Sequence, residues 1–343
     1  MVICTGCSNT TAPTPISFKD NRTLSVAVTT AQEDNFDRAF TTALEAGMQA
    51  TNLALSWDDL ETAPGAYTPE PNFLAIANTF YPTQHIKVAL EINPIDTSTL
   101  RLPKDLQDKP FDDPMVIERY QQLLDWAFEQ VPDLEVTSLT IGNEIDAYMG
   151  DDPVRWQQYQ TFFEAVAGYA RTLDPDLNIG TKATFNGLTE TSQEFLQRLN
   201  RSSDVIMATY YPLEGDFVPK PAEVVHVDFE ALTTLYEGRP IYLLEIGYPS
   251  GTSCGSSEEQ QAAFIEHTFE AWDVYHEQIQ LLSFTWLTDL SPSTIEGMVD
   301  YYGVENACFA EFLATLGLRT HTGDDKKSFT QLKQEVDERI AEP

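Results

Sequence analysis

The sequence predicts an α/β fold, a single (β/α)8 barrel, on three observations. Short apolar segments typical of buried strands alternate with longer amphipathic segments typical of helices, which is the pattern of a parallel α/β fold. The 343 residues suit one barrel, which needs about 250 residues plus loops. No break in composition divides the alternating part. We therefore expect the barrel over residues 21–343, after a signal remnant and tether over residues 1–20.

Eight candidate strands follow one another, each an apolar run bounded by polar or turn-forming residues. Their approximate ranges are 24–29, 50–55, 86–92, 136–142, 178–184, 205–212, 240–246 and 281–287. Helices are expected between them, beginning at Asp113-Pro114 and Asp152-Pro153, where each pair supplies a cap and a first helical residue. Ser256-x-x-Glu259 is expected to form a capping box at the start of another helix.

The composition narrows the function classes. Acidic residues outnumber basic ones by 54 to 20, and the formal net charge is −34. This charge argues against a nucleic-acid partner, because phosphate binding needs a concentrated basic surface. It disfavours polyanionic polysaccharides for the same reason. No apolar run approaches the ~18 residues that a membrane helix requires, so we expect a soluble globular protein and a monomer.

The N-terminus contains two of the four cysteines, Cys4 and Cys7. Thr5-Gly6-Cys7 resembles the end of a bacterial lipoprotein signal, in which the cysteine is acylated after cleavage. Either the start of such a signal has been trimmed or the similarity is accidental. The first alternative predicts an extracytoplasmic protein with a lipid anchor at Cys7, followed by a flexible segment up to Asp20 that is rich in Thr, Pro and Ser.

Two candidate strands end on a glutamate. The fourth runs into Gly142-Asn143-Glu144, and the seventh runs into Glu245. The two glutamates are about a hundred residues apart, which leaves room for about three strand–helix repeats, and in a barrel the carboxyl ends of the strands form the active-site face. An isolated Asn-Glu is as readily explained by a helix cap or a loop ion pair. Two strand-terminal glutamates facing each other favour catalysis.

Facing carboxyl groups can cleave a glycosidic bond. About 5–5.5 Å apart, one protonates the leaving oxygen and the other attacks the sugar, with retention of configuration. The two groups must differ in protonation, and each carboxylate raises the pKa of its neighbour. We therefore predict a glycosidase that needs neither a metal nor an organic cofactor.

Gly142-Asn143-Glu144 at one strand end and Glu245 at another resemble the clan A retaining glycoside hydrolases. This resemblance implies that Glu144 is the acid/base, that Glu245 is the nucleophile and that Asn143 binds the 2-hydroxyl of the sugar. A tyrosine that orients the nucleophile matches Tyr211 better than Tyr210. An aromatic floor of the catalytic subsite matches Trp286.

The same motifs resemble two groups within the clan most closely. Tyr-Tyr-Pro at 210–212 and Glu-Ile-Gly-Tyr-Pro-Ser at 245–250 are similar to the plant-type β-1,3-glucanases and to the endo-β-1,4-galactanases. The chain departs from both: it has Ser250 where galactanases have a tryptophan, and Tyr248 where the glucanases commonly have one. No residue matches the strand-two arginine of several clan members. We expect endo action on a neutral polysaccharide, first β-1,3-glucan and then β-1,4-galactan.

Further residues could line the cleft. Trp57 at the end of the second strand could stack on a sugar, or equally pack in the core. Asn93 and Glu91 end the third strand on the same side. Tyr248 follows the nucleophile and could contribute to a subsite.

Three alternatives and one possible cross-link remain. Lys182 in the fifth strand could form a Schiff base, as in a barrel aldolase, but the paired glutamates would then be unexplained. A metal-dependent hydrolase is disfavoured because the five histidines form no ligand pair in the sequence. A carbohydrate-binding barrel without catalysis is the non-enzymatic alternative. Cys254 and Cys308 follow the seventh and eighth strands, where they form either a disulfide or two unrelated buried thiols.

Overall fold

Parallel strands make up the centre of the molecule. The structure, a computed structural model, describes residues 17–341. Its strands are β1 Thr23–Val26, β2 Ala50–Ser56, β3 Glu61–Ala63, β4 Ala66–Tyr67, β5 Lys87–Asp96, β6 Thr99–Leu100, β7 Val136–Asn143, β8 Asn178–Gly180, β9 Lys182–Thr184, β10 Ile206–Tyr210, β11 Ile241–Ile246 and β12 Ile279–Phe284. The main sheet runs in the order β8-β7-β5-β2-β1-β12-β11-β10-β9.

The two ends of this sheet belong to one interrupted strand. β8 pairs with β7, β9 pairs with β10, and only Thr181 separates β8 from β9 along the chain. The sheet therefore closes on itself, and the strand predicted over 178–184 is the point of closure. Every pairing along the closed path is parallel, which confirms the predicted (β/α)8 barrel.

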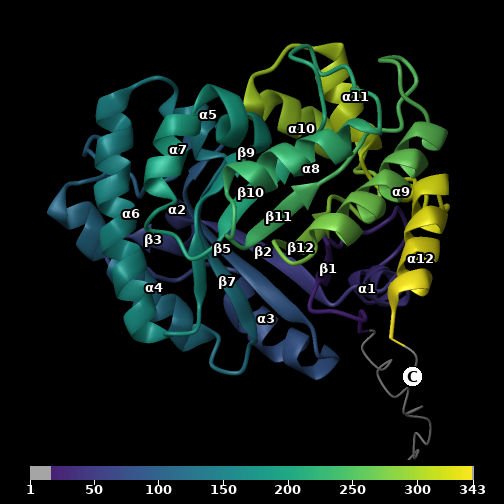
Figure 1. Cartoon of the computed structure of the whole chain (residues 1–343). Coiled ribbons are helices and arrows are strands. Elements are labelled where there is room, and N and C mark those ends of the chain that lie inside the picture. The colour runs from purple at the N-terminus through teal and green to yellow at the C-terminus, as the bar shows by residue number, and fades with distance from the viewer. Residues whose placement is uncertain (1–16, 342–343) are drawn as a thin grey trace, which may run out of the picture.

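Helices surround the barrel (Figure 1). They are α1 Phe36–Glu45, α2 Trp57–Leu60, α3 Phe73–Phe80, α4 Pro114–Gln130, α5 Ile145–Met149, α6 Pro153–Leu173, α7 Gln193–Leu199, α8 Val224–Leu235, α9 Glu258–Tyr275, α10 Pro292–Tyr302, α11 Ala307–Thr315 and α12 Lys327–Arg339, with a 3-10 turn η1 at Tyr81–Gln84 and a π turn η2 at Gly187–Thr191. None of the helices in the described part of the chain combines the length and the apolar character of a membrane-spanning segment.

Side-chain capping explains where several helices begin. Asp113 and Asp152 accept backbone N–H bonds at the starts of α4 and α6, as their Asp-Pro sequences predict. The predicted cap of α9 is wrong by one residue. Ser257 accepts from the backbone of Gln260, whereas the Ser256 hydroxyl donates to the Pro249 carbonyl.

The predicted tether extends too far along the chain. Phe18 is buried, packs edge-on against Trp272 and forms a β-bridge with Ile340, so the barrel begins before the predicted boundary at residue 21. A boundary this close to an apolar residue could not be set by composition alone. The proposed acylation site Cys7 lies outside the described residues.

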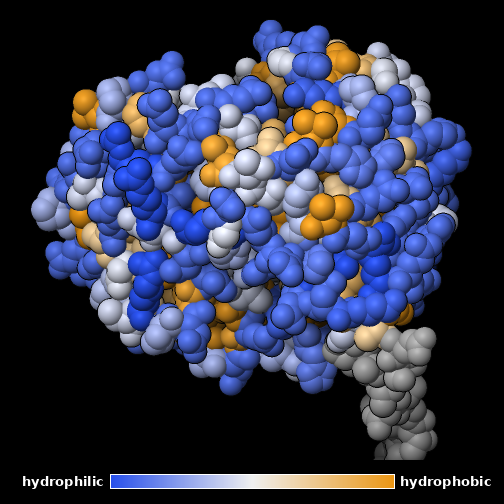
Figure 2. All heavy atoms as spheres, viewed as in Figure 1, coloured by the Kyte–Doolittle hydropathy of each residue, from blue (hydrophilic) through white to orange (hydrophobic). Residues whose placement is uncertain are grey.

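Part of the interior of the barrel is apolar. Met207, Tyr242 and Leu244 belong to a buried apolar cluster that contains residues from β5, β10, β11 and β12. A second, larger cluster contains residues of both strands and helices, and it joins the barrel to the helices around it. The visible surface is mainly hydrophilic with scattered apolar residues, as the net charge of −34 suggests (Figure 2).

Candidate active site

Glu144 lies in a turn at the carboxyl end of β7, and packing fixes the shape of that turn. Its backbone is left-handed (φ 44°, ψ 46°), directly before helix α5. Gly142 has a φ of 88°, and a Cβ atom there would lie 2.8 Å from the Tyr159 hydroxyl oxygen and 2.7 Å from Ile145. Only glycine fits this position, because both the backbone conformation and the space exclude a side chain. The turn delivers Glu144 to the mouth of the barrel.

Two hydroxyl groups form hydrogen bonds to the Glu144 carboxyl group. The Thr209 hydroxyl donates to Oε1 at 2.7 Å, and the Thr97 hydroxyl donates to Oε2 at 3.0 Å. No basic side chain of the described residues forms an ion pair with it. Burial, and then the negative charge of Glu245, raises the pKa of Glu144 to about 7, against the opposing effect of the two hydroxyls. A group with this pKa still holds a proton near neutral pH.

A β-bulge directs Glu245 toward the mouth. Consecutive residues of β10 pair with Leu243 and Glu245, so that Leu244 is an extra residue in β11. Leu244 belongs to the interior cluster, and regular alternation would then turn Glu245 outward to the helices. The bulge changes that direction. Its irregular backbone is satisfied across the barrel, where Asn52 Nδ2 donates to the Leu244 carbonyl at 2.5 Å.

Two donors hold the Glu245 carboxylate. Lys182 Nζ donates to Oε1 at 2.7 Å, and the Tyr211 hydroxyl donates to Oε2 at 2.8 Å. The side chain of Glu245 is 28% exposed, so one side of it faces the open mouth. The cation and the hydroxyl donor together fix the orientation of this carboxylate.

Lys182 is buried between two carboxylates. Its Nζ also donates to Glu91 Oε2 at 2.7 Å, and both side chains of this pair are 1% exposed. Burial alone would lower the pKa of Lys182, but the charges of Glu245 and Glu91 outweigh burial and raise it. Burial raises the pKa of Glu91 in turn, although Lys182 opposes this. A lysine that stays protonated is a poor Schiff-base nucleophile, which argues against the aldolase alternative.

Asn143 is held beside Glu144 by a third carboxylate. Asn143 Nδ2 donates to Asp96 Oδ1 at 2.8 Å, and the Tyr301 hydroxyl donates to Asp96 Oδ2 at 2.8 Å. The Oδ1 atoms of Asn143 and Asn93 are buried, and neither has a hydrogen-bond partner among the described residues. Unsatisfied buried acceptors are unfavourable, so both positions suit a hydroxyl donor from a ligand.

Aromatic side chains lie near Tyr211, the hydroxyl donor to Glu245. Trp286 and Tyr302 pack in one apolar cluster with Tyr211, and Trp286 is partly exposed. Burial, followed by the negative charges of Asp96, Glu245 and Glu144, raises the pKa of Tyr302. Tyr302 is therefore close to Asp96, Glu245 and Glu144, although no sequence motif pointed to it.

Pleat alternation separates the two neighbouring tyrosines. Tyr211 faces Glu245, whereas the Tyr210 hydroxyl donates to Asp228 at 2.7 Å and its ring packs against Phe229 of α8. The prediction that Tyr210 could contact substrate is therefore wrong. In a strand, consecutive side chains point to opposite faces, so only one tyrosine of the pair can reach the mouth.

Two further predicted contacts with substrate are wrong. Trp57 is fully buried, donates from Nε1 to Glu61 at 2.8 Å and meets Tyr120 edge-on, so the core-packing alternative applies. Tyr248 is 2% exposed, and its hydroxyl donates to the Lys220 carbonyl at 2.6 Å. Both aromatic rings pack between strands and helices, since nearby apolar surface outweighs their position at a strand end.

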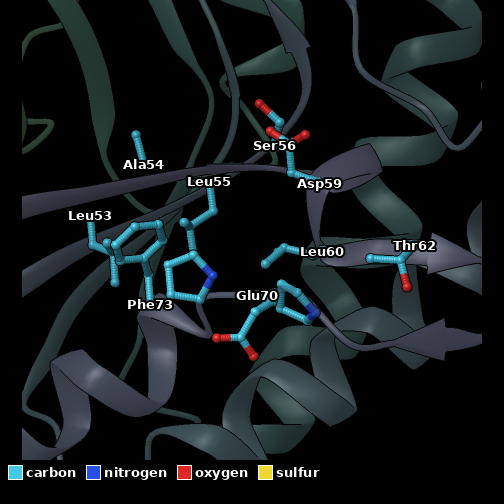
Figure 3. A pocket seen from close by; sticks show the side chains of 11 residues that line it. Leu53, Ala54, Leu55, Ser56, Asp59, Leu60, Thr62, Glu70 and Phe73 are labelled. Atoms are coloured by element: carbon cyan, nitrogen blue, oxygen red, sulfur yellow. The ribbon is translucent and has the colours of Figure 1, made fainter.

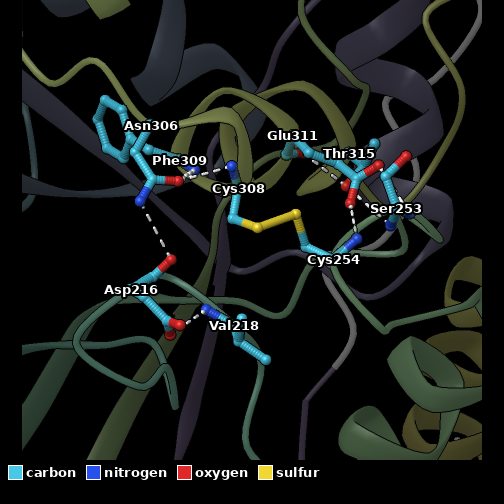
Figure 4. The surroundings of a disulfide bond; sticks show 10 residues. Asp216, Val218, Ser253, Cys254, Asn306, Cys308, Phe309, Glu311 and Thr315 are labelled. Carbon is cyan, nitrogen blue, oxygen red and sulfur yellow. Dashed lines mark hydrogen bonds between the residues drawn. A yellow bond between two sulfur atoms is a disulfide. The ribbon is translucent and has the colours of Figure 1, made fainter.

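A disulfide joins a loop to a helix at the mouth face. Cys254 and Cys308 are bonded in the structure, with their Cα atoms 5.5 Å apart (Figure 4). Beside the bond, Glu311 accepts from the backbone N–H groups of Ser253 and Cys254 at 3.0 and 2.7 Å. The disulfide ties the loop after β11, the strand that carries Glu245, to helix α11.

Two large hollows lie away from the paired glutamates. A cavity of about 630 Å³ lies against β2 and α3, where Leu53, Leu55 and Phe73 are among its lining residues (Figure 3). A second cavity of about 720 Å³ lies between α10 and α11. Neither is lined by Glu144 or Glu245, so the chemistry of the side chains, rather than cavity size, locates the site.

Sequence comparisons find no relatives. No protein-family model matches the chain, and no curated protein is similar to it in sequence.

Solved structures, in contrast, share its fold. A GH5_18 protein from Bifidobacterium longum subsp. infantis is 12% identical over 94% of this chain and 80% of that one, with a TM-score of 0.69. A GH5_18 protein from Streptomyces cattleya in complex with Manβ1-4GlcNAc is 15% identical over 92% and 80%, with a TM-score of 0.69. The GH53 catalytic domain from Ignisphaera aggregans is 16% identical over 85% and 86%, with a TM-score of 0.63. The chain shares the TIM-barrel fold of these glycoside hydrolases.

Proposed function

We propose that this protein is a retaining β-glycoside hydrolase. The observation that carries the proposal is the unequal environment of two carboxyl groups at one mouth. Glu144, with a pKa raised to about 7, suits a proton donor at neutral pH. Glu245, held by Lys182 and Tyr211, suits an ionised nucleophile.

In the first step, Glu144 gives its proton to the glycosidic oxygen. The bond between the anomeric carbon and that oxygen breaks, and the leaving sugar departs with the proton. A carboxylate oxygen of Glu245 bonds to the anomeric carbon and forms a glycosyl ester. Lys182 and Tyr211 orient the attacking carboxylate, and their placement before the reaction avoids reorganisation in the transition state.

In the second step, Glu144 acts as a base. Esterification removes the negative charge of Glu245, so the pKa of Glu144 is expected to fall and its carboxylate can accept a proton from water. The water oxygen attacks the anomeric carbon, the ester bond breaks, and Glu245 leaves as a carboxylate. Two displacements at the same carbon give a product with the configuration of the substrate.

A neutral β-linked glycan is the substrate class that the site favours. Glu91, Asp96, Glu144 and Glu245 place four carboxyl groups near the mouth, and the cation among them, Lys182, is already bound to two. A uronic acid would meet net negative charge there. On the sequence motifs, β-1,3-glucan is the first candidate and β-1,4-galactan the second.

We propose endo action on the basis of the motif resemblance. One contact in the structure favours exo action as a second candidate. Tyr301 of α10, which follows β12, bonds to Asp96 at the end of β5. Strands β1 and β2 lie between β12 and β5 in the sheet, so this contact crosses the mouth above them. A cleft that this contact crosses above β1 and β2 is open mainly on the opposite side. Such a shape favours attack at the end of a glycan chain.

A panel of polysaccharides tests the activity: laminarin, galactan, mixed-linkage glucan, mannan and xylan, each with wild type and with Glu245→Ala. We expect oligosaccharides or monosaccharides from one substrate, with their release lost in the variant. Proton NMR of the first product is expected to show the β anomer. Product length early in the reaction separates endo from exo action.

Two outcomes would reject the proposal. Activity that survives Glu245→Ala would remove the assigned nucleophile, and an α anomer as first product would indicate inversion. Saturable binding of one glycan without any product from the panel or from aryl glycosides would favour the carbohydrate-binding alternative.

We also propose that the protein is exported and anchored through Cys7. The motif Thr5-Gly6-Cys7 supports this, and a disulfide between Cys254 and Cys308 suits an oxidising compartment. Mass spectrometry of the N-terminal peptide after expression in a bacterium with a lipoprotein pathway is expected to find Cys7 diacylated. A Cys7→Ser variant that remains equally bound to membranes would contradict the anchor.

A further inference from the structure

Three potential metal ligands meet on the outer wall of the barrel, away from the glutamates. His226 is on α8, and His267 and Glu270 are one turn apart on α9. His226 Nε2 lies 3.3 Å from His267 Nδ1, and Glu270 Oε2 lies 3.0 Å from His267 Nδ1 and 3.4 Å from His226 Nε2. The cluster cannot be recognised in the sequence, because the two histidines are 41 residues apart.

These three distances match the edges of a metal coordination shell. In a tetrahedral zinc site with Zn–N bonds of about 2.0–2.1 Å, neighbouring ligand atoms are about 3.3 Å apart. The observed triangle has sides of 3.0, 3.3 and 3.4 Å. An ion at this bond length would lie about 1 Å above the plane of the three atoms, so no ligand needs to move far to bind it.

Hydrogen bonds alone satisfy this triangle poorly. If each histidine nitrogen donates a proton to Glu270 Oε2, two N–H donors face each other at 3.3 Å without an acceptor between them. If one nitrogen donates to the other instead, the accepting nitrogen has no proton for Glu270. A cation at the centre would use one lone pair from each of the three atoms.

We propose that His226, His267 and Glu270 form a binding site for a divalent transition-metal ion of the zinc type. Two imidazoles and one carboxylate suit zinc and its neighbours, whereas Ca²⁺ and Mg²⁺ require oxygen ligands. The three side chains are 40%, 30% and 50% exposed, so an ion can reach them and water can complete the shell.

Such an ion would cross-link α8 to α9. These helices follow β10 and β11, which lead to Tyr211 and carry Glu245. The site is therefore structural and takes no part in the proposed hydrolysis. The ion would stabilise the part of the barrel wall that lies behind the nucleophile.

Calorimetric titration of the full chain with Zn²⁺ tests this site. The thiols of Cys4 and Cys7 are first alkylated, and a large excess of Mg²⁺ occupies sites that consist of carboxylates alone. We expect one saturable equivalent of Zn²⁺ and a rise in the thermal midpoint. His226→Ala and His267→Ala should each weaken binding by about tenfold or more, an effect at the low end of that seen for lost metal-site residues, and should abolish the thermal shift.

His276→Ala is the matched control, since His276 lies at the end of α9 and, within residues 17–341, its ring forms a hydrogen bond only to the Asp273 carbonyl. It should bind Zn²⁺ as wild type does. Wild-type affinity in the double variant His226→Ala/His267→Ala, or no saturable binding by the wild type, would overturn the proposal. Circular dichroism checks that these surface variants remain folded.

Discussion

Glu144 and Glu245 are the same residue type at the same barrel mouth, yet their surroundings differ. Glu144 follows β7 and accepts from the hydroxyls of Thr209 and Thr97, and no cation of the described residues forms an ion pair with it. Glu245 follows a bulge in β11 and accepts from Lys182 and Tyr211. Burial and a nearby like charge raise the pKa of Glu144 to about 7. A buried cation compensates the charge of Glu245.

This difference is the basis for the chemical roles that we propose. Burial without a neighbouring cation favours the protonated form of Glu144. The two environments are also coupled, because the charge of Glu245 is one reason that Glu144 remains protonated. Substitutions that change one environment at a time therefore test whether the two glutamates differ in this way.

Removal of the nucleophile should have the largest effect. Glu245→Ala is expected to lower kcat by about four orders of magnitude or more, as the loss of a nucleophile does in other enzymes. Azide can fill the space of the missing carboxylate, so added azide should restore turnover of an aryl glycoside and give an α-glycosyl azide. A β-glycosyl azide from this variant would mean that the two roles are reversed.

Removal of the acid should have a smaller effect that depends on the leaving group. Glu144→Gln is expected to lower kcat/KM for natural substrates by about 10²–10⁴, and less for aryl glycosides with acidic phenols, which need no proton. Wild-type kcat/KM should fall as the pH rises through about 7, because the active form of Glu144 is protonated. A pH profile measured with both proteins checks this, since the alkaline limb should disappear in Glu144→Gln.

Loss of the buried cation should weaken the nucleophile without removing it. Lys182→Met alone would leave Glu91 buried and unpaired, which is strongly destabilising. The test therefore uses Lys182→Met/Glu91→Gln, for which we expect a roughly hundredfold loss of kcat, the upper range for a bond to a charged group.

Glu91→Gln alone is the control for that variant. It keeps the contact between Lys182 and Glu245, so its activity should exceed that of the double variant by tenfold or more. Equal activity in the two proteins would show that the cation does not support the nucleophile.

The fold and the two glutamates could be predicted because their signals are local. Alternating apolar segments indicate the strands, and Gly142-Asn143-Glu144 ends its strand within three residues. The partners of the glutamates come from distant strands. Lys182 meets Glu91 across 91 residues, and Thr209 meets Glu144 across 65. Closure of the barrel brings them together, and no local pattern records which interior side chains then touch.

The aromatic predictions failed for a related reason. Trp57 and Tyr248 lie next to strand ends, where a side chain can face the mouth or the surrounding helices. Their burial depends on apolar surface from other elements, such as Tyr120 of α4 and Phe264 of α9. For Tyr210 and Tyr211 the signal was present, because strand alternation allows only one of two neighbours to face the mouth.

Those two neighbours provide the next test. Tyr211→Phe removes one donor to Glu245 and should lower kcat by about tenfold, the lower range for a bond to a charged group. Tyr210→Phe removes a bond to Asp228 outside the barrel, so kcat should change little while stability falls. Kinetics and thermal unfolding of both variants check this, and equal losses of kcat would contradict the assignment.

The smallest expected effect is on stability, and it tests the Glu144 environment without substrate. The pKa of Glu144 is raised from 4.5 to about 7 in the fold, so between these pH values the native state holds a proton that the unfolded state has lost. The contribution of Glu144 to the free energy of unfolding is therefore fully present below about pH 4.5 and is lost as the pH rises through about 7. Glu144→Gln removes the titration, and at pH 8 it should be more stable than wild type by about 1–3 kcal/mol. Urea unfolding at pH 5 and pH 8 measures this, and an equal difference at both pH values would mean that Glu144 is not the buried acid.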